Sequence, residues 1–336
     1  MTHLLEVNEL TVCAEKNKKQ FKIIDDVSFY INEGEITGLA GESGSGKTIT
    51  ALSILNLLPV NIKITKGNII FNNQSLFNLK ENRIQTGIGS GISAIFQDAR
   101  SALNPIMKSG RQITEVLELE RKQAGIKLQF SEKRKQREKD RETALEILSS
   151  LGFSNPQKVF NAYPHQLSGG MCQRVMTAVA AIGNPKLLIG DEPSSSLDDE
   201  SQNRSLSYLM EMNRVQKTSL LLISHDLSII QKYCERYIIM YGGKIIEEGP
   251  SSALFSPLHP YTQALINAIP NKEKRGEYLK SIKGKSLTIN EKFSGCPFFS
   301  RCDKAKDVCK DAFPPKKEIN SAKVFCHFPK AAGDTA

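Results

Sequence analysis

The chain has 336 residues. A chain of this length is too long for a single small hydrophobic core, so two or three domains are expected. Apolar residues make up 40% and charged residues 24% of the sequence, which excludes a largely disordered chain. The formal net charge of +9 favours anionic partners such as nucleotides, nucleic acids or acidic lipid head groups.

The sequence predicts neither a membrane span nor a secretion signal. No run of about 18 apolar residues occurs. The first ten residues, MTHLLEVNEL, lack the basic segment and apolar stretch of a signal peptide. We therefore expect the protein in the cytosol, where disulfides are rare. Of its seven cysteines, four crowd the C-terminal part of the chain, and that cluster needs an explanation other than disulfide bonds.

The predicted elements begin with strands and continue as alternating strands and helices. Strands are predicted at residues 4–12, 27–31 and 35–41, followed by a glycine-rich turn that opens an apolar helix at 41–58. Further strands are predicted at 67–76 and 91–98, and helical spacing dominates residues 106–157. The mixed-charge run EKRKQREKDRE at residues 132–142 is interpreted as a solvated helix face rather than a nucleic-acid patch.

The second half of the chain indicates a parallel sheet. Apolar runs of strand length at residues 185–193 and 219–227 flank a predicted helix at 202–216. This alternation is typical of parallel strands joined by crossover helices, so the fold class is α/β. Two more strands are predicted at 237–243 and 244–249, after which prolines and cysteines replace the periodic pattern.

The stretch GESGSGKT at residues 41–48 fits the pattern G-x-x-x-x-G-K-[ST] of a phosphate-binding loop. Glycines let such a loop surround an anion with its N–H groups, and the following helix N-terminus adds partial positive charge. Lys47 can reach the β- and γ-phosphates, and Thr48 offers an oxygen to Mg²⁺. The predicted nucleotide-binding residues here are Gly41, Ser43, Gly44, Ser45, Gly46, Lys47 and Thr48.

Further residues fit the hydrolysis of a nucleotide. Asp191 and Glu192 end a predicted strand; Asp191 is predicted to hold Mg²⁺, and Glu192 to orient and deprotonate the attacking water. Gln97, after another strand, can reach the metal and the water, and His225 can contact the γ-phosphate. Phe21 is interpreted either as a residue that stacks on adenine or as an ordinary core or hairpin aromatic.

Together these motifs resemble the ATP-binding cassette (ABC) ATPases over nearly all of residues 4–249. The motifs that carry the resemblance are GESGSGKT (Walker A), LLIGDE (Walker B), FQD (Q-loop), SLDD from Ser196 (D-loop), ISHD (H-loop) and LSGGMCQR (signature motif). The resemblance implies a P-loop (RecA-like) ATPase core with an antiparallel β subdomain and a helical subdomain. It also implies that Ser168, Gly169 and Gly170 face outward and cap the ATP held by a second ATPase subunit.

Two stretches, YPHQLSGGM and FSPLHPYTQALINAIP, are similar to the ATPases of oligopeptide, dipeptide and nickel importers. This resemblance implies a nucleotide-binding domain at residues 1–250, with its helical subdomain at about 98–175, and a small extension at 251–336. It implies an ATPase at the cytoplasmic face of the cell membrane. Its partners would be a second ATPase subunit (a paralogue or itself), two permease subunits and, indirectly, a solute-binding protein. The tyrosine and prolines around HPYT are interpreted as packing and turn residues.

Four cysteines crowd the C-terminal extension: Cys296, Cys302, Cys309 and Cys326. They lack the C-x2–4-C pairs that zinc sites usually show. Four thiolates suit an iron–sulfur cluster, and the similar importer ATPases imply a [4Fe–4S] cluster with a structural role. Zinc and unligated thiols are the alternatives.

The cofactors expected are therefore ATP, Mg²⁺ and the [4Fe–4S] cluster, and the expected cargo is an oligopeptide or dipeptide. Nickel or a metal chelate would use the same mechanism. A soluble ABC ATPase that acts on nucleic acid would use the positive charge differently. The single cassette, without a long coiled-coil insertion or CxxC fingers, argues against that class, and no nucleic-acid partner is expected.

Overall fold

The computed structural model describes residues 3–16, 19–78, 83–84, 91–193, 198–269, 282–285, 287 and 293–330. The chain divides into two compact units. The first comprises Met1–Asn32, Ile36–Gln85 and Leu222–Ala336, and the second comprises Glu33–Glu35 and Thr86–Leu221. No described helix combines the length and the apolar character that a membrane span requires. The predicted domain boundaries at residues 98, 175 and 250 stay predictions.

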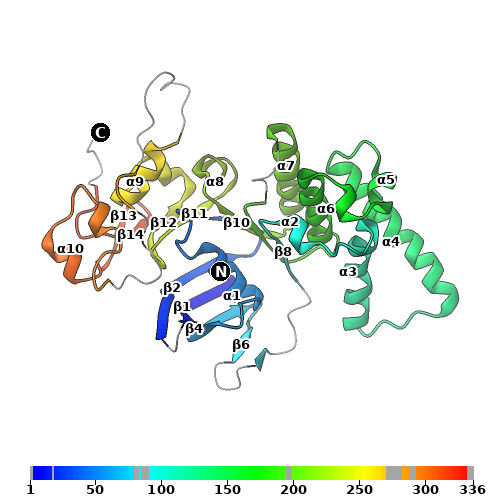
Figure 1. Cartoon of the computed structure of the whole chain (residues 1–336), viewed down its shortest axis with the longest axis horizontal. Helices are drawn as coiled ribbons and strands as arrows, with labels where there is room; N and C mark the ends of the chain where they lie inside the picture. The colour runs from blue at the N-terminus through cyan, green and yellow to red at the C-terminus, as the bar shows by residue number, and fades with distance from the viewer. Residues whose placement is uncertain are drawn as a thin grey trace. The chain divides into compact units, whose positions relative to one another are not determined.

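The first unit contains an antiparallel sheet in the order β2-β1-β4-β5 (Figure 1, blue to cyan). Its strands are β1 (His3–Lys16), β2 (Lys19–Asn32), β4 (Ile62–Phe71) and β5 (Gln74–Ser75). β1 pairs with β2 on one side and β4 on the other, and it buries Leu5, Val7 and Val12. The strands predicted at 4–12 and 27–31 are confirmed, but β1 and β2 extend further.

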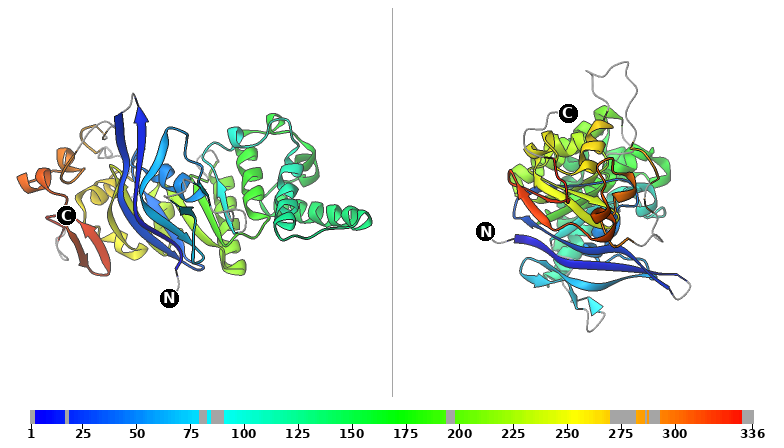
Figure 2. Two further views of the ribbon diagram at one scale, coloured as in Figure 1. Left: turned by 90° about the horizontal axis from the view of Figure 1, so that it is seen from below. Right: turned by 90° about the vertical axis from the view of Figure 1, so that its left-hand side faces the viewer.

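The same unit contains a sheet in which the strand order β13-β14-β12-β11-β3 occurs. The bounds are β3 (Ile36–Ala40), β11 (Arg236–Tyr241), β12 (Lys244–Pro250), β13 (Lys316–Ile319) and β14 (Ala322–Phe325). β3 and β11 are parallel, which agrees with the α/β fold class. β14 pairs antiparallel with β12, so the last described strands extend this sheet (Figure 2, red beside yellow).

Short helices and strands complete the first unit. They are α1 (Lys47–Leu55), β6 (Phe77–Asn78), β7 (Arg83–Ile84), α8 (Leu227–Tyr233), η2 (Ser251–Phe255), α9 (Pro260–Asn267), η4 (Phe299–Arg301) and α10 (Asp307–Asp311). α8 packs on β3, where a Cβ on Gly38 would lie 2.5 Å from the Ile230 side chain. This close approach fixes the strand that leads into the phosphate-binding loop.

The second unit is mainly helical. Its parallel strands are β8 (Ile92–Ile95) and β9 (Leu187–Asp191), and β10 (Ser219–Ser224) begins here and ends in the first unit. Its helices are α2 (Ala99–Ala102), α3 (Ser109–Gln123), α4 (Phe130–Ser150), α5 (Pro156–Asn161), η1 (Pro164–Gln166), α6 (Gly169–Ala181) and α7 (Asp199–Gln216). α3 packs against α4, α5 and α6 (Figure 1, green), so the helical character predicted for residues 106–157 is confirmed.

The mixed-charge run at residues 132–142 lies on α4, and most of its side chains are exposed, as predicted. Asp140 is the exception, with only 3% of its surface exposed. Its carboxylate accepts hydrogen bonds from both terminal nitrogens of Arg121 on α3, at 3.0 and 2.5 Å, and from Gln136 at 3.0 Å. Because α4 otherwise buries few side chains, this ion pair is a main link between α3 and α4.

We expect Asp140→Asn to lower the free energy of unfolding by about 3 kcal/mol, because Arg121 then lies largely buried without a carboxylate partner. Urea unfolding followed by circular dichroism measures the change. The matched control is Glu211→Gln, which removes an exposed ion pair with Arg214 and should change stability little. Equal losses in the two variants would contradict the importance assigned to the buried pair.

Candidate functional site

The segment between β3 and α1 has the form predicted for a phosphate-binding loop. α1 begins at Lys47, directly after Gly46, whose φ is 106°. Gly41 and Gly44 also have positive φ, at 150° and 81°, a conformation that favours glycine. A Cβ on Gly41 would lie 2.2 Å from the carbonyl oxygen of Met240 on β11. Residue 41 therefore has room for glycine alone.

The Lys47 ammonium lies inside this loop. It donates hydrogen bonds to the carbonyl oxygens of Gly41 and Glu42, at 2.7 and 2.9 Å, and lies 3.4 Å from Ser45 Oγ. The first turn of α1 carries no acidic residue, so the helix N-terminus keeps its partial positive charge for an anion. The loop residues that face solvent are Ser43, Gly44 and Thr48.

In the second unit, two predicted catalytic residues meet. Gln97 follows β8 and Glu192 follows β9, and these strands are parallel neighbours. The Gln97 side-chain nitrogen donates a hydrogen bond to the Glu192 carboxylate at 3.2 Å. Glu192 has a φ of 50°, a strained conformation for a residue with a side chain. Asp191 ends β9 and is 6% exposed. The Glu192 carboxylate, held by the Gln97 amide, is suited to positioning a water molecule.

The N-terminus of α6 carries the predicted signature residues. Ser168 caps the helix, accepting a hydrogen bond from the Met171 N–H at 3.2 Å. Ser168 and Gly169 are exposed, and outside its own helix and chain neighbours a Cβ on Gly169 would meet nothing within 4 Å. Gly170 is half-buried. Cys172, within the signature motif LSGGMCQR, is fully buried.

The remaining predicted residues occupy varied positions. His225 directly follows β10 and is exposed. Phe21 lies within β2 opposite Ala14, and its contact with adenine stays a prediction. Ser196 of the predicted D-loop lies outside the described residues.

The predicted nucleotide residues occur in both units. The first unit holds residues 41–48, Phe21 and His225, and the second holds Gln97, Asp191, Glu192 and residues 168–170. The roles assigned to them stay predictions.

The four C-terminal cysteines gather around one small cavity. The residues that line this cavity of about 10 Å³ are Cys296, Cys302, Cys309, Cys326, His259, Pro260, Phe299, Lys304, His327 and Phe328. Burial raises the pKa of Cys296 to about 12 and that of Cys326 to about 11. In the described part of the chain, no group of three or more His, Cys, Asp or Glu residues is arranged to hold a metal ion. The predicted iron–sulfur cluster is therefore not confirmed.

His259, in the wall of the same cavity, is 1% exposed. Its Nδ1 accepts a hydrogen bond from the Tyr261 N–H at 3.0 Å, and burial lowers its pKa to about 3. The ring is thus neutral, and its proton lies on Nε2. Within the described residues this Nε2–H has no hydrogen-bond partner, which is costly for a buried donor.

Two residues that the sequence analysis missed contact the phosphate-binding loop. The Tyr261 hydroxyl accepts a hydrogen bond from the Glu42 N–H at 2.7 Å. Arg301 donates to both carboxylate oxygens of Glu42, at 2.6 and 3.0 Å. Tyr261 also packs as interpreted, since its ring is buried against Tyr241 and Phe298, and the hydrogen bond to Glu42 is an additional role. No local pattern marks either contact, because the partners lie 219 and 259 residues apart.

The comparisons with known proteins agree with these observations. Residues 24–195 match the family described as "ABC transporter", and residues 246–309 match the C-terminal region of oligopeptide/dipeptide transporters. The chain is 38% identical to the dipeptide transport ATP-binding protein DppD of Haemophilus influenzae, over 97% of this chain and 96% of the relative. It is 40% identical to the oligopeptide transport ATP-binding protein AppD of Bacillus subtilis, over 92% and 91% respectively.

Solved structures show the same fold. A dimeric ATP-binding cassette in a post-hydrolysis state with ADP and phosphate aligns with a TM-score of 0.61 at 23% identity, covering 74% of this chain and 98% of that one. CbiO1 of Clostridium perfringens, part of an ABC transporter complex, aligns with a TM-score of 0.58 at 23% identity, covering 76% and 92%.

We expect Gly41→Ala to destabilise the nucleotide-free protein more than Gly44→Ala. Both residues have positive φ, so each substitution strains the backbone by about 1 kcal/mol. A Cβ at residue 41 additionally collides with the Met240 carbonyl, whereas one at residue 44 meets nothing within 4 Å. Urea unfolding without nucleotide compares them, and equal stability of the two variants would contradict the close approach.

Proposed function

This chain belongs to the ABC transporter family, and we propose that it is the ATP-hydrolysing subunit that energises peptide import through a membrane permease. The observation that carries the proposal is the match of residues 246–309 to the C-terminal region of oligopeptide/dipeptide transporters, since this region lies beyond the cassette. The relatives named as dipeptide and oligopeptide transport ATP-binding proteins support the same cargo class over at least 92% of the chain.

The chain binds ATP through the phosphate-binding loop. Lys47 contacts the β- and γ-phosphates, and the N–H groups of the loop surround them. Thr48, Gln97 and Asp191 are the residues that would hold Mg²⁺. Their hydroxyl, amide and carboxylate oxygens are donors that Mg²⁺ prefers. When bound, the ion neutralises charge on the phosphates.

Glu192 is the general base in this proposal. The water oxygen attacks the γ-phosphorus while the Glu192 carboxylate takes a proton from that water. The bond from the γ-phosphorus to the β–γ bridging oxygen breaks, and ADP leaves with the electron pair. The amide of Gln97 orients the Glu192 carboxylate through its 3.2 Å hydrogen bond. His225 contacts the γ-phosphate.

The partners follow from the exposed N-terminus of α6. Ser168, Gly169 and Gly170 cap the ATP held by a second ATPase subunit, either a paralogue or another copy of this chain. ATP binding closes the two subunits and hydrolysis reopens them. Two permease subunits receive this motion at the cytoplasmic face of the membrane, and a solute-binding protein acts on them from the other side.

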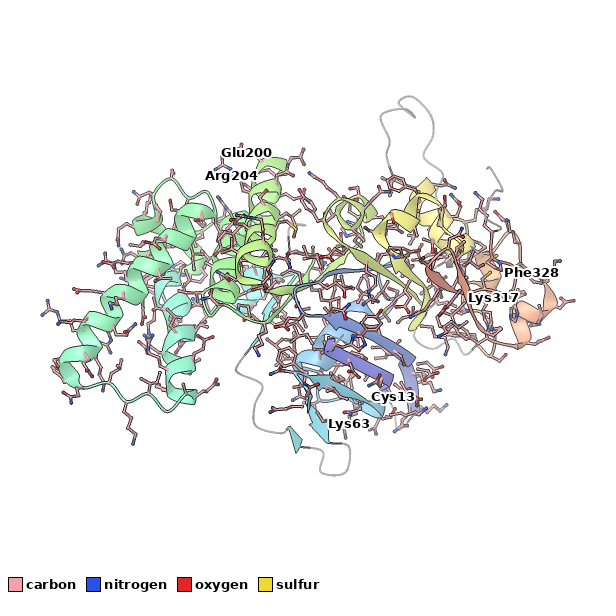
Figure 3. The ribbon with its side chains drawn as sticks, turned by 180° about the vertical axis from the view of Figure 1, so that it is seen from behind. Cys13, Lys63, Glu200, Arg204, Lys317 and Phe328 are labelled. Carbon is pink, nitrogen blue, oxygen red and sulfur yellow. The ribbon has the colours of Figure 1, made fainter. Side chains whose placement is uncertain are left out.

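Glu192→Gln should keep ATP binding and lower hydrolysis by roughly 10²–10⁴-fold, because an amide cannot accept the proton of the attacking water. Phosphate release and binding of a fluorescent ATP analogue measure the two properties. The matched control is Glu200→Gln on α7, which removes an exposed carboxylate paired with Arg204 (Figure 3) and should leave hydrolysis unchanged.

Uptake by intact cells tests the cargo with the same variants. Cells with Glu192→Gln should lose uptake of a labelled dipeptide or oligopeptide, and cells with Glu200→Gln should retain it. If cells with Glu192→Gln lost only the uptake of radioactive nickel, the proposed mechanism would stand but the cargo would be a metal and not a peptide. Unchanged uptake of both solutes would overturn the importer proposal, and nucleic-acid binding would be the next assay.

The four C-terminal cysteines hold an iron–sulfur cluster, [4Fe–4S], in this proposal. Four sulfurs that line one cavity supply the donor set of such a cluster. The partnerless Nε2–H of His259 in the cavity wall suits a hydrogen bond to a cluster sulfur. Burial raises the pKa of Cys296 and Cys326, so cluster binding would have to release the protons of these thiols. When bound, the cluster would stabilise the extension.

Anaerobically purified protein should be brown and contain about four irons per chain. Cys302→Ser should lower the iron content and the visible absorbance. The control is Cys13→Ser, because Cys13 lies on β1 opposite Lys63, in the other sheet (Figure 3). Colourless protein with stoichiometric zinc, or without any metal, would reject the cluster.

A further inference from the structure

We propose that Arg301 is a positioning residue for ATP binding: it neutralises Glu42 and holds the phosphate-binding loop in the form that accepts ATP. The inference rests on the ATPase function proposed above and deepens it. It assigns to the C-terminal extension a direct part in nucleotide affinity.

The ion pair between Arg301 and Glu42 has the geometry of a strong one. Two parallel hydrogen bonds of 2.6 and 3.0 Å join the guanidinium to both carboxylate oxygens. The Arg301 side chain is 4% exposed and that of Glu42 is 21% exposed. A bidentate ion pair that is largely shielded from water is stronger and less sensitive to salt than an exposed surface pair.

The surrounding structure holds Arg301 in one place. Its Nε donates to the carbonyl oxygen of Lys283 at 2.8 Å, and a terminal nitrogen donates to the Tyr241 hydroxyl at 3.1 Å. The guanidinium also lies 5.8 Å from the ring centres of Tyr241 and Phe298. A planar cation with this many directional contacts fixes its partner more firmly than a lysine would.

The backbone of Glu42 is held by the same extension. Its N–H donates to the hydroxyl of Tyr261, whose ring packs against Tyr241 and Phe298 at centre distances of 4.6 and 5.2 Å. The extension therefore contacts residue 42 at two points: Tyr261 accepts a hydrogen bond from its N–H, and Arg301 pairs with its carboxylate.

Electrostatics gives this contact a functional consequence. Glu42 follows Gly41 in a loop that must accept the negative phosphates of ATP, and a bare carboxylate there would repel them. Arg301 cancels that charge. The Lys47 ammonium also donates to the Glu42 carbonyl oxygen at 2.9 Å, so a shift of residue 42 would displace the lysine that contacts the phosphates.

The test measures ATP affinity and steady-state hydrolysis of the full-length chain. Arg301→Ala should weaken ATP binding about tenfold, raising KM with little change in kcat. The loss should shrink as the KCl concentration rises, because salt screens the carboxylate left behind. Arg301→Ala combined with Glu42→Gln should recover most of the affinity, because the repelling charge is gone. Arg301→Lys should give an intermediate value.

The matched control is Lys323→Met, which removes the 2.9 Å ion pair between Lys323 of the same extension and Glu248 on β12 and leaves the contacts of Glu42 in place. Its ATP affinity should equal that of the wild type. Unchanged affinity in folded Arg301→Ala, or no recovery with Glu42→Gln, would overturn the proposal. If Arg301→Ala does not fold, Arg301→Lys with and without Glu42→Gln provides the same comparison, and wild-type affinity in Arg301→Lys would overturn it. A wild-type chain that binds no ATP would instead reject the proposed function.

Discussion

The close approach of Gly41 to β11 determines the form of the phosphate-binding loop. The loop starts against the carbonyl oxygen of Met240, where a side chain would have no room. It then turns through Gly44 and Gly46, both with positive φ, into the N-terminus of α1. This path directs the Lys47 ammonium into the loop, onto its own carbonyl oxygens. The phosphate contacts assigned to the loop all depend on that turn.

Local sequence patterns predict much of the fold and of the candidate site. The phosphate-binding loop between a strand and a helix, the acidic end of β9 and the serine cap of α6 each arise within about ten residues of chain. The hydrogen bond between Gln97 and Glu192 is less local. It is still foreseeable, because the carboxyl ends of neighbouring parallel strands meet at one edge of a sheet.

Contacts made across long stretches of chain escape such patterns. HPYT identifies a family, yet nothing in it indicates that Tyr261 reaches the backbone of Glu42. Asp140 stands in a run of charges whose other members are exposed, and only the packing of α3 on α4 buries it. The cysteine spacing likewise suggests ligands without showing that β14 brings Cys326 to the cavity of the other three. Tertiary structure decides each of these cases.

The contacts of Tyr261 and Arg301 with Glu42 also set the order in which parts of the structure can form during protein synthesis. The loop leaves the ribosome early, whereas Tyr261 and Arg301 follow 219 and 259 residues later. At translation rates of roughly 5–20 residues per second, that interval is on the order of 10–50 s. A nascent chain cannot form either contact with Glu42 until most of the protein has been made. Truncated products that end before residue 301 lack the ion pair with Glu42, and if Arg301 positions the loop as proposed, they bind ATP more weakly than the complete chain.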